Sequence, residues 1–264
     1  MKTIGLIASG KIEVYTFLKY IPEKKKLKLG PFDVYYFKLN GYEVFLVISD
    51  KRMTSARLAT SLLIEKISPL LIVSFGIAGA IEEDIQVGDI ICGNSTTMIE
   101  NGVFEQYIAL SIIPNEIRKF ILNLVVEQKE RIFFGTIVTV NGEQAIYDYD
   151  KIRFYHPVLD METLGVAQAA SRRKVPVFSI RGITHSLAVQ SSSNIHTIID
   201  YTSHYNKGAA IRKILTHPWL VFKVTGYFIV KLKVSAHIAS TLYSLLQVLS
   251  IENKSSDNEP DYQI

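Results

Sequence analysis

Residues 70–80, with the sequence LLIVSFGIAGA, decide the fold class of this chain. The first six residues form an apolar run broken only by Ser74, which is typical of a strand covered on both faces. Small residues follow directly at 76–80, and they let a ligand approach the backbone closely. The stretch therefore predicts a buried strand that ends in a ligand-binding loop.

Strand and helix patterns alternate on both sides of this stretch. An Asn-Gly pair at positions 40 and 41 separates two strand patterns and indicates a β-hairpin. A helix is expected at 54–67, with Thr54 as its cap. The other strand patterns lie at 4–8, 33–39, 43–48, 87–92, 133–140, 157–161 and 175–183, and the other helix patterns at 14–21, 115–128 and 163–173. This order predicts a three-layer α/β/α fold, and the hairpin makes its central sheet mixed.

The composition excludes several classes of protein. With 48% hydrophobic residues in 264, the chain can build a core, so global disorder is excluded. Its net charge of +4 is too small and too dispersed to indicate nucleic-acid binding. The single cysteine, Cys92, excludes an intrachain disulfide framework and is interpreted as a small buried hydrophobe. The missing secretory signal and the single cysteine favour a cytoplasmic protein.

The chain is expected to divide into three parts: an α/β domain over 1–190, a helical extension packed on it over 191–251, and a flexible tail over 252–264. The stretch 219–249 is very apolar but carries Lys223, Lys231 and Lys233. One interpretation is a packed helix that caps the domain or forms an oligomer interface. The other is peripheral membrane contact through 219–250, with lysines beside anionic headgroups.

Three segments that are candidates for binding or catalysis follow strand patterns: 76–80, 160–162 and 181–185. In open α/β sheets, ligands bind beyond the carboxyl ends of the strands. These segments therefore predict a small-molecule site. No metal is expected, because His196, His204, His217 and His237 do not have a metal-ligand spacing.

The ordered motifs resemble those of a known family. They are LNG at 39–41 with Val44, SFGIAGA at 74–80, QVGDI at 86–90, DMET at 160–163 with Ala167, and VFSIRGIT at 177–184. Over about residues 1–190 the set resembles the nucleoside phosphorylase/hydrolase superfamily, which includes purine nucleoside phosphorylase and methylthioadenosine/S-adenosylhomocysteine nucleosidase. The C-terminal extension is more loosely similar to the hopanoid-associated branch.

The resemblance implies roles for individual residues. Glu162 matches the glutamate that binds the ribose hydroxyls, and a carboxylate suits a vicinal diol and a ribosyl cation. Glu13 falls where the nucleosidases orient the attacking water, which favours hydrolysis. The remaining matches are Met161 against the sugar, Ala78 and Gly79 beside the nucleoside, Thr139, Val140 and Ile146 around the base, and Arg52 for phosphate. No cofactor is implied, phosphate is a co-substrate only for a phosphorylase, and a homo-oligomer is expected.

His185 departs from the family pattern. The family has Asp or Asn there, to protonate or hydrogen-bond the purine N7. An imidazolium can also donate a proton near neutral pH. Three functions therefore stay open: hydrolysis of the N-glycosidic bond of a purine nucleoside or conjugate, which is favoured, a nucleoside-binding protein that has lost catalysis, and phosphorolysis.

Each residue also has a structural interpretation. Glu162 could be a surface or capping residue, Glu13 a solvated helix residue, and His185 a structural histidine. The glycines of 76–80 could form a tight turn without a ligand. For Arg181 a buried ion pair is favoured.

Overall fold

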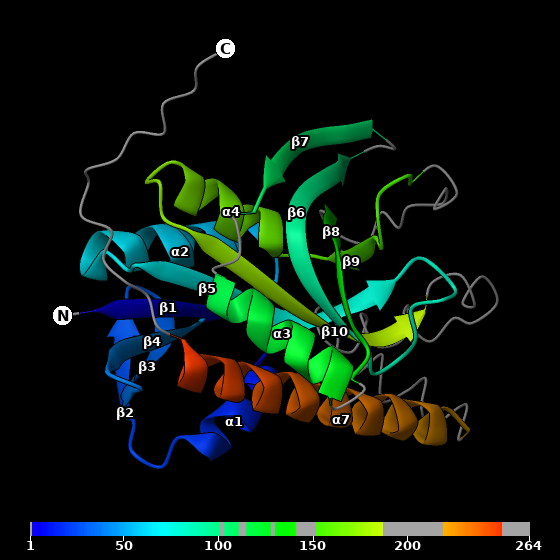
Figure 1. Cartoon of the computed structure of the whole chain (residues 1–264), viewed down its shortest axis with the longest axis horizontal. Helices are drawn as coiled ribbons and strands as arrows, with labels where there is room; N and C mark the ends of the chain where they lie inside the picture. Colours follow the sequence, from blue (N-terminus) through cyan, green and yellow to red (C-terminus); the bar gives the residue numbers. More distant parts are fainter. Residues whose placement is uncertain are drawn as a thin grey trace.

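The computed structural model describes residues 2–100, 103–110, 115–127, 130–140, 152–186 and 219–249. Within these stretches a mixed sheet forms the middle layer and helices cover both of its faces (Figure 1). This confirms the predicted three-layer α/β/α architecture. None of the helices in the described stretches combines the length and apolarity needed to cross a membrane.

The strands of the sheet follow the order β10–β6–β8–β9–β5–β1–β4–β3–β2, and β7 pairs with β6. Their bounds are β1 Thr3–Ala8, β2 Lys25–Leu29, β3 Phe32–Leu39, β4 Tyr42–Ile48, β5 Leu71–Ala80, β6 Ile90–Glu100, β7 Val103–Ala109, β8 Ile132–Val140, β9 Val158–Asp160 and β10 Val177–Ser186. Strands β1, β4, β5 and β10 run parallel, whereas β3 is antiparallel to β4 and β10 is antiparallel to β6. Because β10 also pairs with β5, the strands from β5 through β9, β8 and β6 to β10 close into a ring.

The helices divide between the two faces of the sheet. They are α1 Lys11–Phe17, which a 3-10 turn Leu18–Tyr20 extends, α2 Met53–Ile67, α3 Asn115–Glu127, α4 Thr163–Ser171 and α7 Trp219–Val248. Alternate side chains of β1 serve the two cores, because successive residues of a strand point to opposite faces. Ile4 and Leu6 pack with α1, α3 and α7, whereas Ile7 packs with α2 and α4.

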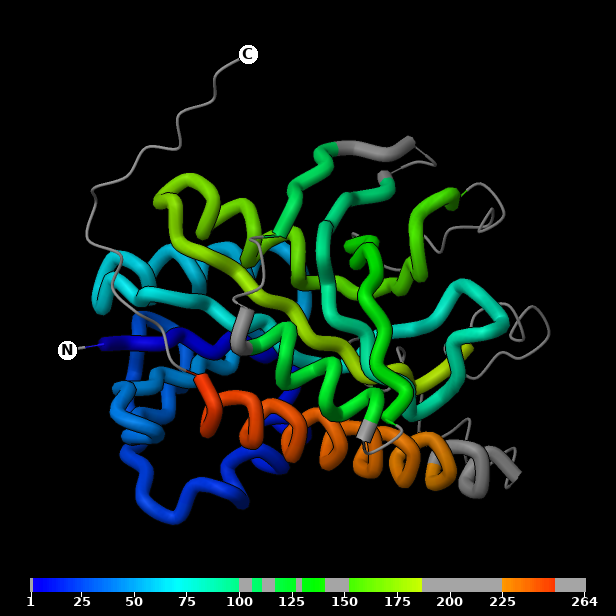
Figure 2. The backbone as a smooth tube through the Cα atoms, in the orientation of Figure 1, coloured from blue at the N-terminus to red at the C-terminus, as the bar shows by residue number. Residues whose placement is uncertain are grey.

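The long helix α7 confirms the packed-helix interpretation of the C-terminal segment. Val234, Ile238, Leu242 and Leu245 are fully buried and belong to the same core as β1 and β3. Figure 2 shows α7 as an orange-to-red rod along one edge of the molecule. The segment 191–218 and the tail 252–264 lie outside the described residues, so the boundary predicted at 190 stays a prediction.

The turn between β3 and β4 confirms the predicted hairpin. Asn40 and Gly41 have φ angles of 48° and 75°, as a type I′ turn requires. Two other local predictions were wrong. Residues 76–80 continue β5 instead of forming a loop, because β9 and β10 both pair with this stretch. Thr54 does not cap α2, since the helix begins at Met53 and Arg52 occupies the cap position without a side-chain hydrogen bond.

Candidate active site

The candidate site lies at the carboxyl edge of the parallel strands. Chain segments that follow β1 and β4 carry Glu13 and Arg52, while Gly79 and His185 lie in the last residues of β5 and β10. The register pairs Ile7 of β1 with Ser74 of β5, so these strands end at one edge. This is the edge where α/β sheets bind ligands.

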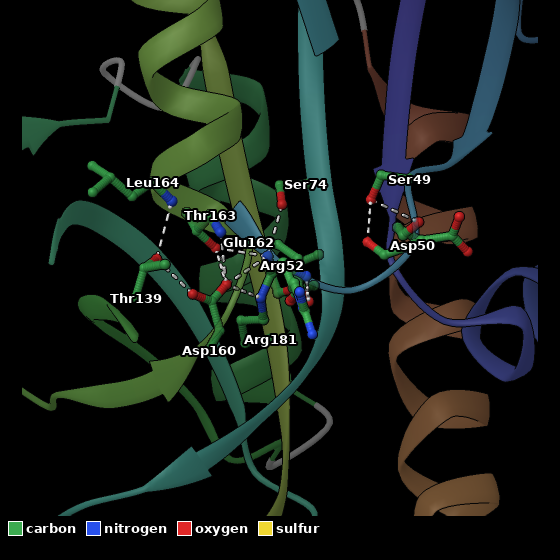
Figure 3. Close-up of polar contacts among 12 residues, drawn as sticks. Ser49, Asp50, Arg52, Ser74, Thr139, Asp160, Glu162, Thr163, Leu164 and Arg181 are labelled. Carbon is green, nitrogen blue, oxygen red and sulfur yellow. Dashed lines mark hydrogen bonds and ion pairs between the residues drawn. The ribbon is translucent and has the colours of Figure 1, made fainter. Parts of the chain in front are cut away.

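A buried ion pair joins the strands close to this edge (Figure 3). Arg181 is 2% exposed, and its Nε and Nη2 atoms donate to Asp160 Oδ2 at 3.0 and 2.9 Å. Nη2 also donates to Ser74 Oγ at 2.7 Å. The buried-ion-pair interpretation of Arg181 is therefore confirmed, and the pair ties β10 to β9 and β5.

Asp160 also holds the start of α4, a role that was not predicted for it. Its Oδ2 atom accepts a hydrogen bond from the backbone N–H of Thr163 at 3.0 Å, and the Thr163 hydroxyl donates to the same oxygen. Asp160 lies two residues before the N-cap position of α4 and bonds the first N–H of the helix. The sequence signal for this role was an aspartate shortly before the helix pattern at 163, because short acidic side chains bond nearby backbone N–H groups.

The three residues that were expected around the base, Thr139, Val140 and Ile146, differ in what the structure shows for them. Thr139 is fully buried, and its hydroxyl donates to Asp160 Oδ1 at 2.7 Å and accepts from Leu164 N–H at 3.0 Å. The structure therefore gives this side chain a supporting role. Val140 packs against the apolar cluster of Ile81 and Ile152. Ile146 lies outside the described residues, so the predicted base contacts of all three residues stay predictions.

Glu162 lies between the ion pair and the end of β4. It occupies the N-cap position of α4, but its side chain makes no cap hydrogen bond, so the capping interpretation was wrong. Instead Glu162 Oε1 accepts a hydrogen bond from the backbone N–H of Arg52 at 3.3 Å. The carboxylate is thus held across two elements that are far apart in the chain, with Met161 directly before it, partly buried.

Burial sets the protonation of Glu162. It raises the pKa of this carboxyl to about 7, and the neighbouring Asp160 adds to the rise. Arg181 and the N–H groups of Arg52 and Met161 oppose it, because they stabilise the carboxylate. A carboxyl with a pKa near neutrality, beside a specific charge partner, is typical of a functional site.

Arg52 contributes its backbone to this arrangement. Its φ of 95° is a conformation that side chains other than glycine rarely adopt, and such strain costs about 1–3 kcal/mol. The side chain itself is exposed. The contact that the structure shows at Glu162 therefore comes from the amide of Arg52, while phosphate binding by its guanidinium stays a prediction.

His185 lies directly over Gly79. A Cβ atom at position 79 would come within 2.4 Å of His185 Nε2, so only glycine leaves room for the imidazole. A bulge between Ile183 and His185 sets this register, and Thr184 Oγ1 lies 3.0 Å from His185 Nδ1. The same hydroxyl donates to the carbonyl of Ala78, which is itself buried. Gly79, in the stretch predicted to bind a ligand, thus leaves room for the His185 side chain. Because this stretch is part of strand β5, the tight-turn interpretation was wrong.

Glu13 is buried, so its interpretation as a solvated helix residue was wrong. It is 3% exposed, and its Oε1 lies 3.6 Å from Lys231 Nζ on α7. Gly10 provides the room, because a Cβ atom there would overlap Glu13 Oε2 at 1.7 Å. Among the described residues Oε2 has no hydrogen-bond partner.

One group among the described residues has the geometry of metal ligands. It consists of Glu82, Asp84 and His156, with His156 Nδ1 3.0 Å from Glu82 Oε2. Its members already pair with one another, and Asp84 is exposed. Cys92 is buried, and burial raises the pKa of its thiol to about 12, in keeping with a small buried hydrophobe.

Known proteins resemble this chain in sequence and in fold. A 5'-methylthioadenosine/S-adenosylhomocysteine nucleosidase of Tolumonas auensis is 26% identical over 230 residues, which cover 80% of this chain and 98% of that protein. One of Aeromonas salmonicida is 25% identical with the same coverage. A solved nucleosidase of this kind from Campylobacter jejuni superposes with a TM-score of 0.71 at 17% identity, covering 94% of this chain and all of that one. A futalosine hydrolase mutant of Helicobacter pylori superposes with a TM-score of 0.70 at 14% identity, with the same coverage.

The family model described as "Phosphorylase superfamily" matches residues 3–213. That range contains the sheet, α1 to α4 and every candidate site residue named above except Lys231. It also agrees with the resemblance seen in the ordered motifs. The chain belongs to the phosphorylase superfamily.

Proposed function

We propose that this protein hydrolyses the N-glycosidic bond of a purine nucleoside or a nucleoside conjugate. The observation that carries the proposal is Glu162, a partly buried carboxyl held by the Arg52 amide at the edge where Glu13 and His185 also lie. The relatives named as methylthioadenosine/S-adenosylhomocysteine nucleosidases support the same reaction class.

Each of the three side chains has a step in this reaction. The ribose hydroxyls donate to Glu162, whose negative charge stabilises the sugar as the bond from C1′ to the base breaks. The bonding electron pair leaves with the base, which takes a proton from the His185 imidazolium. Water attacks C1′, and Glu13 accepts its proton. The products are the free base and the free sugar.

The test is base release from a panel of purine nucleosides, including adenosine and 5′-modified adenosines, with and without phosphate. We expect release without phosphate. Release only with phosphate would instead support phosphorolysis, with Arg52 as the candidate anion ligand. Nucleoside binding without release would support a binding protein.

Two variants assign the roles. Glu162→Gln keeps the shape but removes the charge, and we expect it to lower kcat/KM about 100-fold or more. His185→Ala should lower kcat by about 100-fold with nucleoside binding largely intact. Glu65→Gln, on the exposed face of α2, is the matched control and should leave both constants unchanged. Activity in Glu162→Gln equal to that of the wild type would contradict the proposal.

A homo-oligomer is also proposed, from the family resemblance. Size-exclusion chromatography with light scattering tests it, and a mass of about 30 kDa at micromolar concentration would contradict it.

A further inference from the structure

Helix α7 places a lysine against the carboxylate that is proposed to orient water. Lys231 Nζ lies 3.6 Å from Glu13 Oε1, and the two side chains are 14% and 3% exposed. The family match ends at residue 213, so this cation comes from a helix beyond the matched part of the chain.

The position of Lys231 on its helix is unusual for a lysine. The buried stripe of α7 runs through Val234, Ile238, Leu242 and Leu245, at spacings of three and four residues. Lys231 precedes Val234 by three residues and therefore continues the same stripe. Lys233 points away from this stripe and is exposed. An interior-facing lysine needs a charge partner, and Glu13 is that partner.

The surroundings of Glu13 leave one of its oxygens buried and without a partner among the described residues. Oε1 faces the ammonium group, whereas Oε2 lies against Gly10 and has no hydrogen-bond partner among the described residues. A buried carboxylate oxygen without a partner carries a large desolvation cost, which a water molecule can relieve. The ion pair thus orients the carboxylate so that Oε2 can accept a proton from water.

We infer that Lys231 is a positioning residue for hydrolysis, which holds the Glu13 carboxylate turned so that Oε2 receives the attacking water. The inference rests on the proposed function. Lys231 acts through Glu13 and does not touch the sugar, so its loss should affect turnover and leave substrate binding largely unchanged.

The experiment measures base release by Lys231→Met, which keeps the stem and removes the charge. We expect kcat to fall about 10- to 100-fold with KM changed less than about threefold. Lys231→Arg restores a cation and should recover most of the lost turnover. Lys233→Met, an exposed lysine of the same helix, is the matched control and should behave like the wild type.

A double-mutant cycle separates this role from a structural one. In a Glu13→Gln background, Lys231→Met should cause no further loss of kcat, because both changes remove the same function. Additive losses, or an unchanged kcat in Lys231→Met alone, would overturn the inference while leaving the proposed hydrolysis intact. If the wild type releases no base, the proposed function fails and the inference falls with it. Melting temperatures of all variants show whether each is folded. If Lys231→Met does not fold, the kcat of Lys231→Arg, alone and in the Glu13→Gln background, still tests the inference.

Discussion

Glu162 shows how the residues of this site combine a structural cost with a chemical use. Its carboxyl lies beside another carboxylate, in surroundings that disfavour its charge, yet a ribose diol needs the charged form as acceptor. The strained amide of Arg52 and the nearby Arg181 offset part of this cost. Activity and stability should therefore respond to pH in opposite directions.

For activity, we expect kcat/KM to fall as pH drops through about 7, where Glu162 takes up a proton in the free protein. The slope should approach a tenfold loss per pH unit below that value. A pH profile of base release measures it. A kcat/KM that stays constant from pH 8 to pH 5 would contradict a working role for the ionised carboxylate.

The contribution of Glu162 to the free energy of unfolding should change with pH in the opposite direction to its contribution to activity. Because the pKa is raised from 4.5 to about 7, the folded state binds this proton more tightly than the unfolded chain. This contribution to the free energy of unfolding is complete below pH about 4.5 and is lost as pH rises to about 7. Glu162→Gln should consequently be more stable than the wild type at pH 8 by about 1–3 kcal/mol, and not at pH 4. Denaturant melts at both pH values measure this difference, which Glu65→Gln should lack.

Gly79 offers a prediction about His185. Gly79→Ala places a Cβ atom where the imidazole lies, so the histidine must move. We expect kcat to fall by about 100-fold, as in His185→Ala, while nucleoside binding weakens much less. Gly226→Ala is the control, since an added Cβ meets no atom there. Full activity in Gly79→Ala would show that His185 does not act from this position.

At the scale of elements, α7 differs between its two halves. Its C-terminal half is packed into the core, whereas Phe228, Ile229 and Leu232 in the other half are 45–50% exposed. The only charged residues of the helix are lysines. An exposed apolar face beside the exposed Lys233 is complementary to an anionic lipid surface.

We therefore predict that the protein binds vesicles that contain anionic lipid, and binds them more weakly at high salt. Ile229→Ser combined with Leu232→Ser should reduce binding at least tenfold. Leu58→Ser, at an equally exposed site on α2, should not. Sedimentation with phosphatidylserine-containing and pure phosphatidylcholine vesicles makes the comparison. Equal binding by the double variant and the wild type would count against the prediction, and a change of oligomeric state in the double variant would assign this face to a second copy.

At the scale of the whole molecule, the Asp160–Arg181 pair joins the strands that close the ring. It contacts β5, β8, β9 and β10 and the first residues of α4. Removing one partner of a buried pair leaves an uncompensated charge, which costs about 3–5 kcal/mol. Asp160→Ala should lower the free energy of unfolding by this amount. The exposed Glu23→Ala should lower it by less than about 0.5 kcal/mol, and chemical denaturation measures both. A loss below about 1 kcal/mol in Asp160→Ala would show that the network does not hold the fold.

The sequence by itself determined the layer architecture and most of the strands and helices, because apolar periodicity and turn residues are local properties. It also pointed to Glu162, Glu13 and His185 as candidates, through the resemblance of the ordered motifs to a known family. The edge strand β7 and the last half of β6 carried no comparable signal. Residues 94–97 of β6 are all polar, and Glu105 and Gln106 interrupt the apolar pattern of β7.

Only the tertiary structure decided what those residues contact. Three of these contacts depend on strands that are distant in sequence. They are the burial of Glu162, the space that Gly79 leaves for His185, and the hydrogen bond from Thr139 to Asp160. The pairing of Glu13 with Lys231 joins residues more than two hundred positions apart. Local patterns reveal which face of an element is buried, but charge partners and desolvation are set by the neighbours that the whole fold brings together.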